Sequence, residues 1–339
     1  YETVMVVPHE EACSVDGVRI SPLPVNGGRA SRMLLTVPRL LARAISEKAD
    51  IYHFHDPELM PAGLLLKLLG KRVVYDVHEH YRTKILSKPW LPKAARVPIA
   101  FAVDAFESAA SRVYDGVVTV DGHIAKKFCG RAVIVSNFPY APDGFEKAAP
   151  VKRRDGEFRL VYVGGLSGER GLYKMVEAMG LVEGDIRLYL AGKHSPQALE
   201  KAKKIKGFER VVWLGTVPWK KSIELQHSAD AGLLLLQPSP SYKNTGEGIA
   251  KLFEYMMCGL PVLASDFPNI KSILEKEGCG LTVDPADPAQ IADRVMYLAK
   301  YPDIRRGMAA AGMRAVREKY NWEHESEKLL GLYEKILAG

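Results

Sequence analysis

The stretch VYVGGLSGERGLYKMVEAM, which spans Val161–Met179, is the clearest indication of the fold class of this chain. A short apolar run leads through a glycine-rich turn into a segment whose apolar residues recur at helical spacing. A strand followed at once by a helix is the repeating unit of α/β folds with a parallel sheet. We therefore expect an α/β fold, and the flanking sequence repeats the same pattern.

The alternation of strand and helix patterns continues almost throughout the chain. The strand candidates are apolar with little polar alternation, which is typical of parallel strands covered by helices on both faces. We expect strands at residues 3–8, 18–24, 50–55, 72–78, 116–120, 132–137, 159–165, 187–192, 211–215, 231–236, 261–265 and 280–284. We expect helices at residues 32–48, 98–113, 171–182, 220–229, 248–258 and 288–300.

A stretch rich in proline, glycine and charge, residues 137–158, interrupts this pattern and is typical of a linker. We expect two doubly wound, Rossmann-like domains in tandem that face each other across a cleft. Their expected boundaries are residues 1–150 and 151–320, and a last helix over 321–339 is expected to cross back to the first domain. Small molecules bind preferentially in such clefts, beyond the carboxyl ends of the strands.

The composition limits the functional classes. The 339 residues, of which 47% are hydrophobic, are enough for two cores. The net charge of +7, from 47 basic and 40 acidic residues, is too weak and too evenly spread to indicate nucleic-acid binding. The sequence contains no apolar span of transmembrane length and no signal-peptide pattern. Its four cysteines have no metal-like spacing and fit a reducing compartment, so we expect a cytoplasmic protein.

The chain begins at Tyr1, without an initiating methionine, and enters a strand pattern at once. A parallel sheet in the first domain would normally hold one more strand. We therefore expect the natural protein to carry about 25–40 further residues before Tyr1, which form a strand, a glycine-containing loop and a helix.

The glycine-rich turn of the second domain has the features of an anion site. Glycines in this turn, among them Gly164 and Gly165, allow a ligand to approach the backbone, and a helix N-terminus attracts anions. Arg170 can bind a phosphate through its guanidinium; a solvated arginine in a tight turn is the alternative. The spacing matches neither GxGxxG nor GxxxxGK[ST], so the turn is neither a dinucleotide fingerprint nor a P-loop.

A second motif lies in GIAKLFEYMMCGLPVLASD, residues 248–266, which predicts a helix followed by a buried strand. Lys251 and Glu254 are three residues apart and therefore share one helix face. As an exposed ion pair they would contribute only about 0.2–0.5 kcal/mol. The surrounding side chains are strongly apolar, however, and charges are rarely placed there without partners. Because a carboxylate suits a ribose diol and an ammonium suits a phosphate, we favour a binding role.

Five segments together resemble the retaining glycosyltransferases of family four, which have the GT-B fold. They are VGGLSGERG, LGTVPWKKSIELQHSADAGLLLL, GIAKLFEYMMCGLPVLASD, EKEGCGLTVDPADPAQIADRVMYL and YNWEHESEKLLGLYEKIL. The likeness covers most of the chain, is densest from residue 158 onward and is specific at the level of the family.

The resemblance implies a nucleotide-sugar donor bound mainly by the second domain and a glycan or lipid-linked acceptor bound mainly by the first. It implies that Glu254 binds the ribose hydroxyls, that Arg170 holds the diphosphate, and that His78 faces the donor sugar and phosphate. We expect His78, Arg170 and Lys251 to be the catalytic residues. The expected donor-binding residues are Gly164, Gly165, Val217, Gly246, Glu247, Gly248, Ile249 and Glu254.

At two positions this chain departs from the family pattern. The family often has arginine at the position of Gly165 and glutamate at the position of Gly246. We expect Lys251 to compensate for the missing arginine and Glu247 to stand in partly for the missing glutamate.

Histidines follow two neighbouring strand patterns of the first domain, in YHFHDPE and VVYDVHEHY. His53 and His55, like His78 and His80, are spaced so that both side chains of a pair would point the same way in a strand. Such pairs suggest a zinc site, but we identify no cysteine or clear carboxylate ligand beside them. We therefore interpret these histidines as polar lining of the cleft and expect no metal and no cofactor.

Residues 82–96 contain five basic side chains and no acidic one, with Leu86, Trp90 and Leu91 among them. Such a segment suits anionic lipid or a polyprenyl-phosphate acceptor; a solvated loop and helix face is the alternative. We expect a peripheral contact with the inner face of the membrane through this segment.

The sequence therefore predicts a metal-independent retaining glycosyltransferase of cell-envelope polysaccharide synthesis, with a UDP-linked donor favoured over a GDP-linked one. Arg170, Lys251 and helix amides would stabilise the leaving diphosphate. Two alternatives stay open: a nucleotide-sugar epimerase of the same architecture, and a non-catalytic protein that binds nucleotide sugars.

Overall fold

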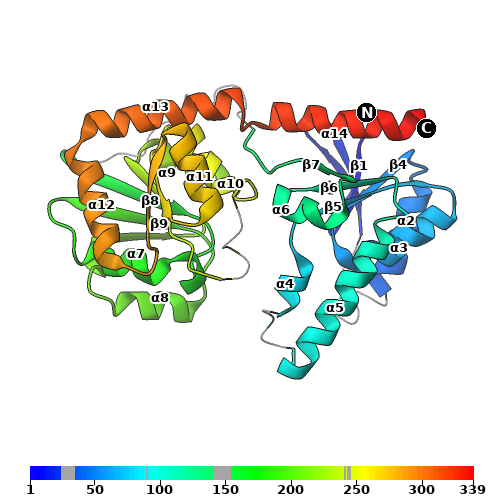
Figure 1. The fold of residues 1–339 in the computed structure, drawn as a ribbon, viewed down its shortest axis with the longest axis horizontal. Helices are drawn as coiled ribbons and strands as arrows, with labels where there is room; N and C mark the ends of the chain where they lie inside the picture. Colours follow the sequence, from blue (N-terminus) through cyan, green and yellow to red (C-terminus); the bar gives the residue numbers. More distant parts are fainter. Residues whose placement is uncertain (24–34, 87, 89–90, 141–153, 240–241, 243–245) are drawn as a thin grey trace. The chain divides into compact units, whose positions relative to one another are not determined.

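The computed structural model describes residues 1–23, 35–86, 88, 91–140, 154–239, 242 and 246–339. Most of the expected linker at residues 137–158, and Trp90 of the basic segment, lie outside these residues. The chain forms two compact units (Figure 1). Unit 1 comprises Tyr1–Val135 with Glu327–Gly339, and unit 2 comprises Ser136–Ser326.

Unit 2 contains a six-stranded parallel sheet in the order β10-β9-β8-β11-β12-β13. In order of sequence this is 3-2-1-4-5-6, the order of a doubly wound fold, and the winding reverses between β8 and β11. The strands are β8 (Phe158–Val163), β9 (Ile186–Ala191), β10 (Val211–Gly215), β11 (Ala231–Leu234), β12 (Val262–Ser265) and β13 (Gly280–Val283).

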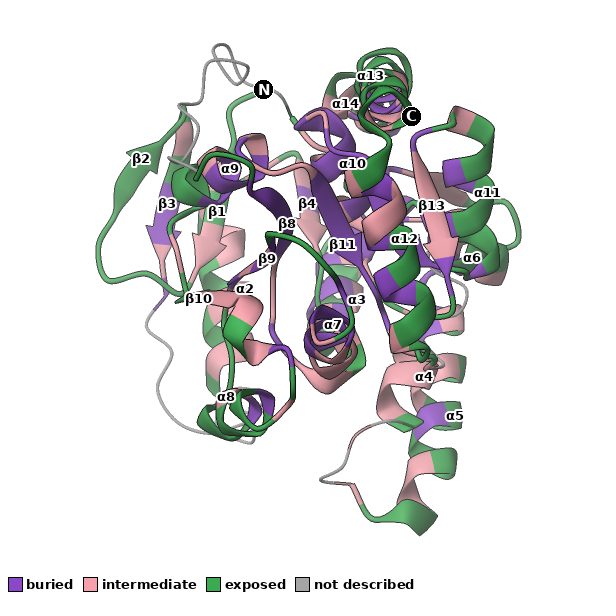
Figure 2. Ribbon diagram, turned by 90° about the vertical axis from the view of Figure 1, so that its left-hand side faces the viewer, coloured by how far each residue is buried: buried purple, intermediate pink, exposed green. Residues whose placement is uncertain are grey.

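Helices cover both faces of this sheet. Leu160 and Tyr162 of β8 belong to one buried cluster and Val161 to the other, because successive residues of a strand point to opposite faces. Figure 2 shows that β8 and β11 are buried. The cluster around Val161 includes α9 (Trp219–His227), α10 (Ala250–Met257), α11 (Pro268–Glu277) and α13 (Pro302–Glu318). The other includes α7 (Leu172–Met179), α8 (Pro196–Lys203) and α12 (Pro288–Lys300). Two 3₁₀ turns accompany them, η5 (Gly168–Arg170) and η6 (Phe208–Arg210).

Unit 1 contains a four-stranded parallel sheet in the order β4-β5-β6-β7. A smaller sheet has the order β1-β3-β2, in which β1 is parallel and β2 antiparallel to β3. The strands are β1 (Val4–Val7), β2 (Cys13–Val15), β3 (Val18–Pro22), β4 (Ile51–Phe54), β5 (Arg72–Val77), β6 (Gly116–Thr119) and β7 (Ala132–Ile134). The helices are α2 (Val37–Ser46), α3 (Met60–Leu68), α4 (Tyr81–Leu86), α5 (Lys93–Ala110) and α6 (Gly122–Ala125), with the 3₁₀ turns η2 (Pro57–Leu59) and η3 (Lys126–Phe128).

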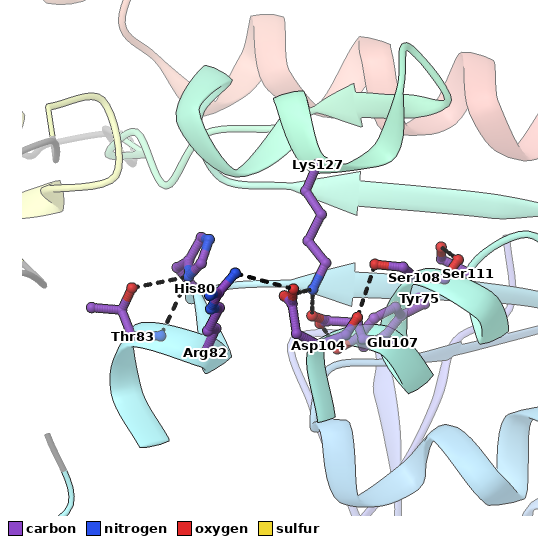
Figure 3. A network of polar contacts seen from close by, with 9 residues as sticks. All are labelled: Tyr75, His80, Arg82, Thr83, Asp104, Glu107, Ser108, Ser111 and Lys127. Carbon is purple, nitrogen blue, oxygen red and sulfur yellow. Dashed lines mark hydrogen bonds and ion pairs between the residues drawn. The ribbon is translucent and has the colours of Figure 1, made fainter. Parts of the chain in front are cut away.

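A buried polar network fixes α5 to the sheet of unit 1 (Figure 3). The Tyr75 hydroxyl of β5 donates a 2.6 Å hydrogen bond to Glu107, whose side chain is 1% exposed. Lys127 of η3 forms ion pairs with both Glu107 and Asp104 of α5. Because a buried carboxylate without a partner is costly, the lysine and the tyrosine together make this position of Glu107 tolerable.

The last helix, α14 (Trp322–Ala338), begins in unit 2 and ends in unit 1. Its Leu332 and Ile336 pack against β6 at Gly116, where an added Cβ would lie 3.1 Å from Ile336 Cδ1. Tyr333 of the same helix reaches His53 of β4. The end of α14 is therefore part of the packing of unit 1.

The expected α/β class with two Rossmann-like units is confirmed, and each expected strand range overlaps an observed strand. The helix expected at 32–48 is observed over Val37–Ser46, and residues 32–34 lie outside the described part. Among the described residues, no helix combines the length and the apolar character needed to cross a membrane.

Candidate active site

The carboxyl end of β8 lies where the winding of the unit 2 sheet reverses. Gly164 follows β8 with a φ of 149°. Gly171, the N-cap of α7, has a φ of 82°, and an added Cβ would lie 2.1 Å from the carbonyl oxygen of Leu235. Only glycine fits there, so the turn after β8 packs directly against the chain that follows β11. This turn is the position at which doubly wound folds bind ligands.

Helix α10 brings Lys251 to this turn. The Lys251 Cε atom lies 3.0 Å from the position that a Cβ on Gly164 would take, so the glycine makes room for the lysine. The Lys251 side chain is 16% exposed, and its Nζ lies 5.8 Å from the ring centroid of Tyr255. The Tyr255 hydroxyl accepts a 3.2 Å hydrogen bond from the backbone N–H of Val163, which fixes α10 to the end of β8. A largely desolvated ammonium group therefore lies at the turn.

Glu254 lies one turn further along α10. Its Oε2 atom is 3.4 Å from Lys251 Nζ, and its side chain is 29% exposed. The expectation that the two side chains share a helix face is confirmed. Their separation exceeds the roughly 2.7–2.9 Å of a strong charge-assisted hydrogen bond, so each group keeps the capacity to bind a ligand.

Arg170 ends η5 on the same turn. Its Cζ lies 3.7 Å from the position of a Cβ on Gly165. Burial by itself lowers the pKa of Arg170, but interactions with the hydroxyls of Tyr162 and Tyr242 outweigh burial, and the pKa is raised above its ordinary value. The Tyr162 hydroxyl also donates a 3.1 Å hydrogen bond to the carbonyl of Gly165. A permanent positive charge is therefore held beside the turn that Lys251 approaches.

Gly246 is a packing requirement in this chain. An added Cβ would lie 2.7 Å from the Cβ of Asn269 in α11, and the Gly246 carbonyl accepts a 3.0 Å hydrogen bond from the N–H of Ile249. Ile249 is the N-cap of α10 and packs with Val217 against the core cluster around Val161. Glu247, by contrast, is exposed. The other predicted donor-binding residues thus lead into α10 or pack against the same cluster: Val217, Gly246, Glu247, Gly248 and Ile249.

A hollow of about 490 Å³ lies at the opposite, amino-terminal ends of β8 and β9. Arg305 lines it, 3.4 Å from Asp230 and stacked 5.0 Å from the ring centroid of Phe158. The cation is already paired with a carboxylate there, and parallel sheets bind ligands at the carboxyl ends of their strands. We therefore assign the candidate site to the carboxyl end of β8.

In unit 1, histidines from two strands gather around Asp76, a largely buried residue of β5. Its Oδ2 atom lies 3.4 Å from His53 Nε2 and 3.2 Å from His55 Nδ1. The Nε2 atom of His78 lies 3.6 Å from the same oxygen. The Nδ1 atom of His55 and the Nε2 atom of His78 share a 2.7 Å hydrogen bond, and their rings stack at 4.9 Å. His78 is thus one member of a four-residue cluster.

The pKa values of the groups in this cluster are shifted in different directions. Burial by itself raises the pKa of Asp76, but the interactions with His53, His55 and His78 outweigh burial and hold the pKa well below its usual range. The hydrogen bond to Asp76 raises the pKa of His55, whereas burial lowers the pKa of His78. A carboxylate and a neutral imidazole of His78 are therefore the favoured forms near neutral pH.

The structure corrects two interpretations of the histidine motifs. A carboxylate does accompany them: Asp76, two residues before His78, is within ion-pair distance of three imidazoles. His80 does not join His78, because both follow the end of β5 and strand alternation no longer applies. The backbone N–H of Thr83 instead donates to His80 Nδ1 at 3.4 Å, and the Thr83 hydroxyl lies 3.0 Å from the same atom (Figure 3).

Part of the positive charge of the basic segment, residues 82–96, is neutralised by ion pairs with carboxylates. Arg82 lies 3.9 Å from Asp104, and Lys84 forms an ion pair with Glu79. The absence of acidic residues within 82–96 is thus offset by carboxylates on either side. Helix α5, which extends away from the sheet of unit 1 in Figure 1, exposes several large apolar side chains. The most exposed of these are Val97, which is 66% exposed, and Phe101, which is 65% exposed.

Sequence reasoning missed residues that support the predicted ones. Asp76 carried a usable signal, because a charged residue inside an apolar strand needs a partner. Tyr162 and Tyr242, which contact Arg170, carried none, since aromatic residues in and near apolar strands usually fill the core. Tyr333 is 280 positions from His53, and no local pattern joins them.

Family models match both halves of the chain. The model described as "Glycosyl transferases group 1" matches residues 143–314, about half of the chain. The model described as "Glycosyl transferase 4-like domain" matches residues 2–133. The chain belongs to the group 1 glycosyl transferases.

Curated relatives support this assignment over part of their length. The chain is 28% identical over 171 residues to the phosphatidyl-myo-inositol mannosyltransferase of Mycobacterium leprae. The aligned residues cover 49% of this chain and 43% of that protein. It is 25% identical over 187 residues to the N-acetyl-alpha-D-glucosaminyl L-malate synthase of Bacillus anthracis. Here the aligned residues cover 54% of this chain and 45% of that protein. The matched stretches therefore span less than half of each relative.

Solved structures share the fold across the whole chain. Sucrose-phosphate synthase from Thermosynechococcus elongatus matches with a TM-score of 0.77 at 18% identity, over 99% of this chain and 89% of that one. Anabaena Alr3699/HepE, solved in complex with UDP and glucose, matches with a TM-score of 0.71 at 13% identity, over 94% of this chain and 87% of that one. The fold is that of the GT-B glycosyltransferases.

Proposed function

We propose that this protein transfers a sugar from a nucleoside-diphosphate sugar to an acceptor hydroxyl. The observation that carries the proposal is the pair of cations, Lys251 and Arg170, beside the carboxylate of Glu254 at the carboxyl end of β8. A nucleoside diphosphate offers matching groups, since its phosphates are anionic and its ribose has two neighbouring hydroxyls. Family membership supports the reaction class.

In this proposal Glu254 accepts hydrogen bonds from the ribose hydroxyls, and Lys251 and Arg170 contact the diphosphate. Backbone amides at Gly165 and at the start of α10 add further donors. Negative charge grows on the diphosphate as its bond to the sugar breaks. Fixed cations in a poorly hydrated site stabilise that charge without reorganising. The protein therefore needs no metal ion for transfer.

We propose retention of configuration at the anomeric carbon. The bond between that carbon and the diphosphate oxygen breaks, and the acceptor oxygen forms its bond on the same face. The acceptor proton passes to the departing phosphate oxygen, so no strong protein base is required. His78, which the fold holds against Asp76 and His55, is proposed to contact the donor sugar and phosphate.

We propose UDP rather than GDP as the nucleotide of the donor. The support comes from the fold neighbours: Anabaena Alr3699/HepE was solved with UDP, and a Burkholderia vietnamiensis neighbour is described as a UDP-forming alpha,alpha-trehalose-phosphate synthase. UDP and GDP, each titrated into the protein by calorimetry, provide the test. Tighter binding of GDP would contradict this choice.

The proposed acceptor is a glycan or a lipid-linked molecule of cell-envelope polysaccharide synthesis, met at the inner face of the membrane. Exposed Val97 and Phe101 on α5, with Lys93 on the same helix, support a peripheral contact with anionic lipid. Flotation with vesicles of phosphatidylglycerol provides the test. Binding should fall in Phe101→Ser and at high salt, and equal flotation with neutral vesicles would contradict the contact.

Product analysis tests the proposed reaction. The protein is incubated with UDP-sugars and a polyprenyl-phosphate or glycan acceptor, with and without EDTA, and the anomeric configuration of the product is read by NMR. The proposal expects transfer that EDTA does not abolish, with the configuration of the donor retained. Conversion of the donor without any acceptor would indicate an epimerase, and binding without turnover would indicate a non-catalytic protein.

A further inference from the structure

The cluster around Asp76 in unit 1 has the spacing of a metal site. Ligand atoms of His53, His55 and Asp76 all lie within 4.8 Å of one another. The distances from Asp76 Oδ2 to the two imidazole nitrogens are 3.4 and 3.2 Å. A tetrahedral zinc ion with bonds of about 2.0–2.1 Å holds neighbouring ligand atoms roughly 3.3 Å apart. Little movement is therefore needed to enclose an ion.

Two atoms of the cluster lack ordinary partners. Among the described residues, Oδ1 of Asp76 and Nε2 of His53 are buried and have no hydrogen-bond partner. Asp76 is only 8% exposed, so its free oxygen is not satisfied by bulk water. Buried polar atoms without partners are uncommon and costly. An ion held by Oδ2 of Asp76 would satisfy Nε2 of His53, and an ion bound by both carboxylate oxygens would satisfy Oδ1 as well.

The surroundings of His53 prepare it as a ligand. Its Nδ1 atom lies 2.5 Å from the hydroxyl oxygen of Tyr333 on α14. The oxygen of a tyrosine hydroxyl can accept a hydrogen bond from a ring N–H. When Nδ1 carries the proton and donates it to Tyr333, Nε2 keeps its lone pair. Histidines that bind metals commonly donate their second ring nitrogen in this way.

We propose that His53, His55 and Asp76 bind one divalent transition-metal ion, with water in the fourth position. Two imidazoles and one carboxylate suit Zn²⁺ or Co²⁺, whereas Mg²⁺ and Ca²⁺ prefer oxygen ligands. The site belongs to unit 1, and the proposed diphosphate contacts Lys251 and Arg170 belong to unit 2. The ion therefore shares no ligand with the residues assigned to the diphosphate, and the proposed transfer itself stays independent of metal.

Occupancy of the site changes the environment of His78. The Nδ1 atom of His55 now shares a hydrogen bond with His78, and it cannot keep that bond while it coordinates an ion. An ion would therefore release His78 from His55. If this contact holds His78 in place for the donor, as the proposed function has it, the loss of the contact displaces His78. Bound Zn²⁺ therefore inhibits transfer.

The test uses the whole chain after EDTA treatment and removal of the chelator. CoCl₂ is titrated and visible absorption is recorded, and ZnCl₂ is titrated by calorimetry. The wild type should bind one ion per chain with the intense absorption of tetrahedral Co²⁺. His55→Gln and Asp76→Asn should lose this signal, and Tyr333→Phe should weaken affinity by about 10–100-fold. His194→Gln, which alters an exposed histidine of unit 2, is the matched control and should bind as the wild type does.

Thermal melting of each variant separates loss of the ion from loss of the fold, and the exposed position of His55 makes His55→Gln the least disruptive variant. Equal binding by the wild type and His55→Gln would overturn the site, as would a loss of equal size in His194→Gln. Transfer is then measured with and without ZnCl₂ within each variant. The absorption titration needs no donor, so failure of the metal site and failure of the proposed function are distinguishable.

Discussion

The carboxyl ends of the two parallel sheets carry opposite kinds of chemistry. At the end of β8 in unit 2, Lys251 and Arg170 are cations, and Glu254 is the carboxylate of the group. At the ends of β4 and β5 in unit 1, Asp76 is surrounded by imidazoles. The first arrangement suits an anion, and the second suits a proton or a metal ion.

Topology determines where a site lies, and a few residues determine what it binds. In unit 2 a residue without a side chain, Gly164, lets Lys251 reach the strand end. In unit 1 a charged residue within the strand, Asp76, draws in histidines from the neighbouring strand. The two sheets share parallel pairing and covering helices, so the contrast arises from these positions.

The largest expected effect comes from removing a cation at the end of β8. Lys251→Ala should lower kcat by about 10²–10³-fold, or about 2.7–4 kcal/mol, as does loss of one oxyanion-stabilising donor. The variant should unfold at nearly the wild-type temperature. Initial rates with saturating donor provide the measurement. Lys203→Ala, at an exposed lysine of α8, is the control, and equal rates in the two variants would remove Lys251 from the reaction.

A smaller effect is expected from the carboxylate on the same helix. Glu254→Gln keeps the shape of the side chain but loses a charged acceptor, which should weaken nucleotide binding by about 1.5–3 kcal/mol. Calorimetry with UDP measures the loss. Unchanged affinity for both UDP and GDP would show that Glu254 does not contact the ribose.

Alanine substitutions at two glycines of unit 2 are expected to differ in their effect on stability. Gly246→Ala places a Cβ 2.7 Å from the Cβ of Asn269 and should destabilise the fold by about 1–3 kcal/mol through overpacking. At Gly165 the nearest atom is Arg170 Cζ at 3.7 Å, so Gly165→Ala should change stability much less. Chemical denaturation of both variants provides the comparison. A larger loss in Gly165→Ala would contradict the packing described here.

The smallest expected effect concerns pH: the affinity of the end of β8 for UDP should not depend on it. The pKa of Arg170 is raised above its ordinary value, and burial raises the pKa of both Tyr162 and Tyr255. The arginine stays charged and the tyrosines stay neutral between pH 7 and 9. Affinity for UDP should therefore be flat over that range. A drop that follows a titration within it would show that another group carries the binding.

Much of the fold could be predicted from the sequence, because buried parallel strands are read from short apolar runs. The helices that were not expected show where this signal ends. Helix α8 has the polar sequence PQALEKAK and buries only Ala198 and Ala202. Helix α13 contains two glycines and buries few residues, among them Gly312 and Ala315. Such helices form because neighbouring elements cover a narrow face, which local sequence does not report.

The predicted site residues have unequal outcomes. The shared face of Lys251 and Glu254 follows from helical spacing and is confirmed. The roles of the predicted donor-binding residues stay predictions. The contact between Asp76 and His53 depends on the pairing of β4 with β5. The contact between Tyr333 and His53 depends on a helix almost at the end of the chain. Long-range partners of this kind cannot be read from local spacing.

Calorimetry with UDP and with uridine, in the wild type and in Lys251→Ala, tests directly whether the end of β8 binds the diphosphate. If the end of β8 binds the diphosphate, the wild type prefers UDP, and the preference falls by at least about tenfold, or about 1.4 kcal/mol, in the variant. The affinity for uridine should stay the same in both proteins. An equal preference for UDP in the wild type and the variant would contradict the claim that Lys251 and its turn form the anion site.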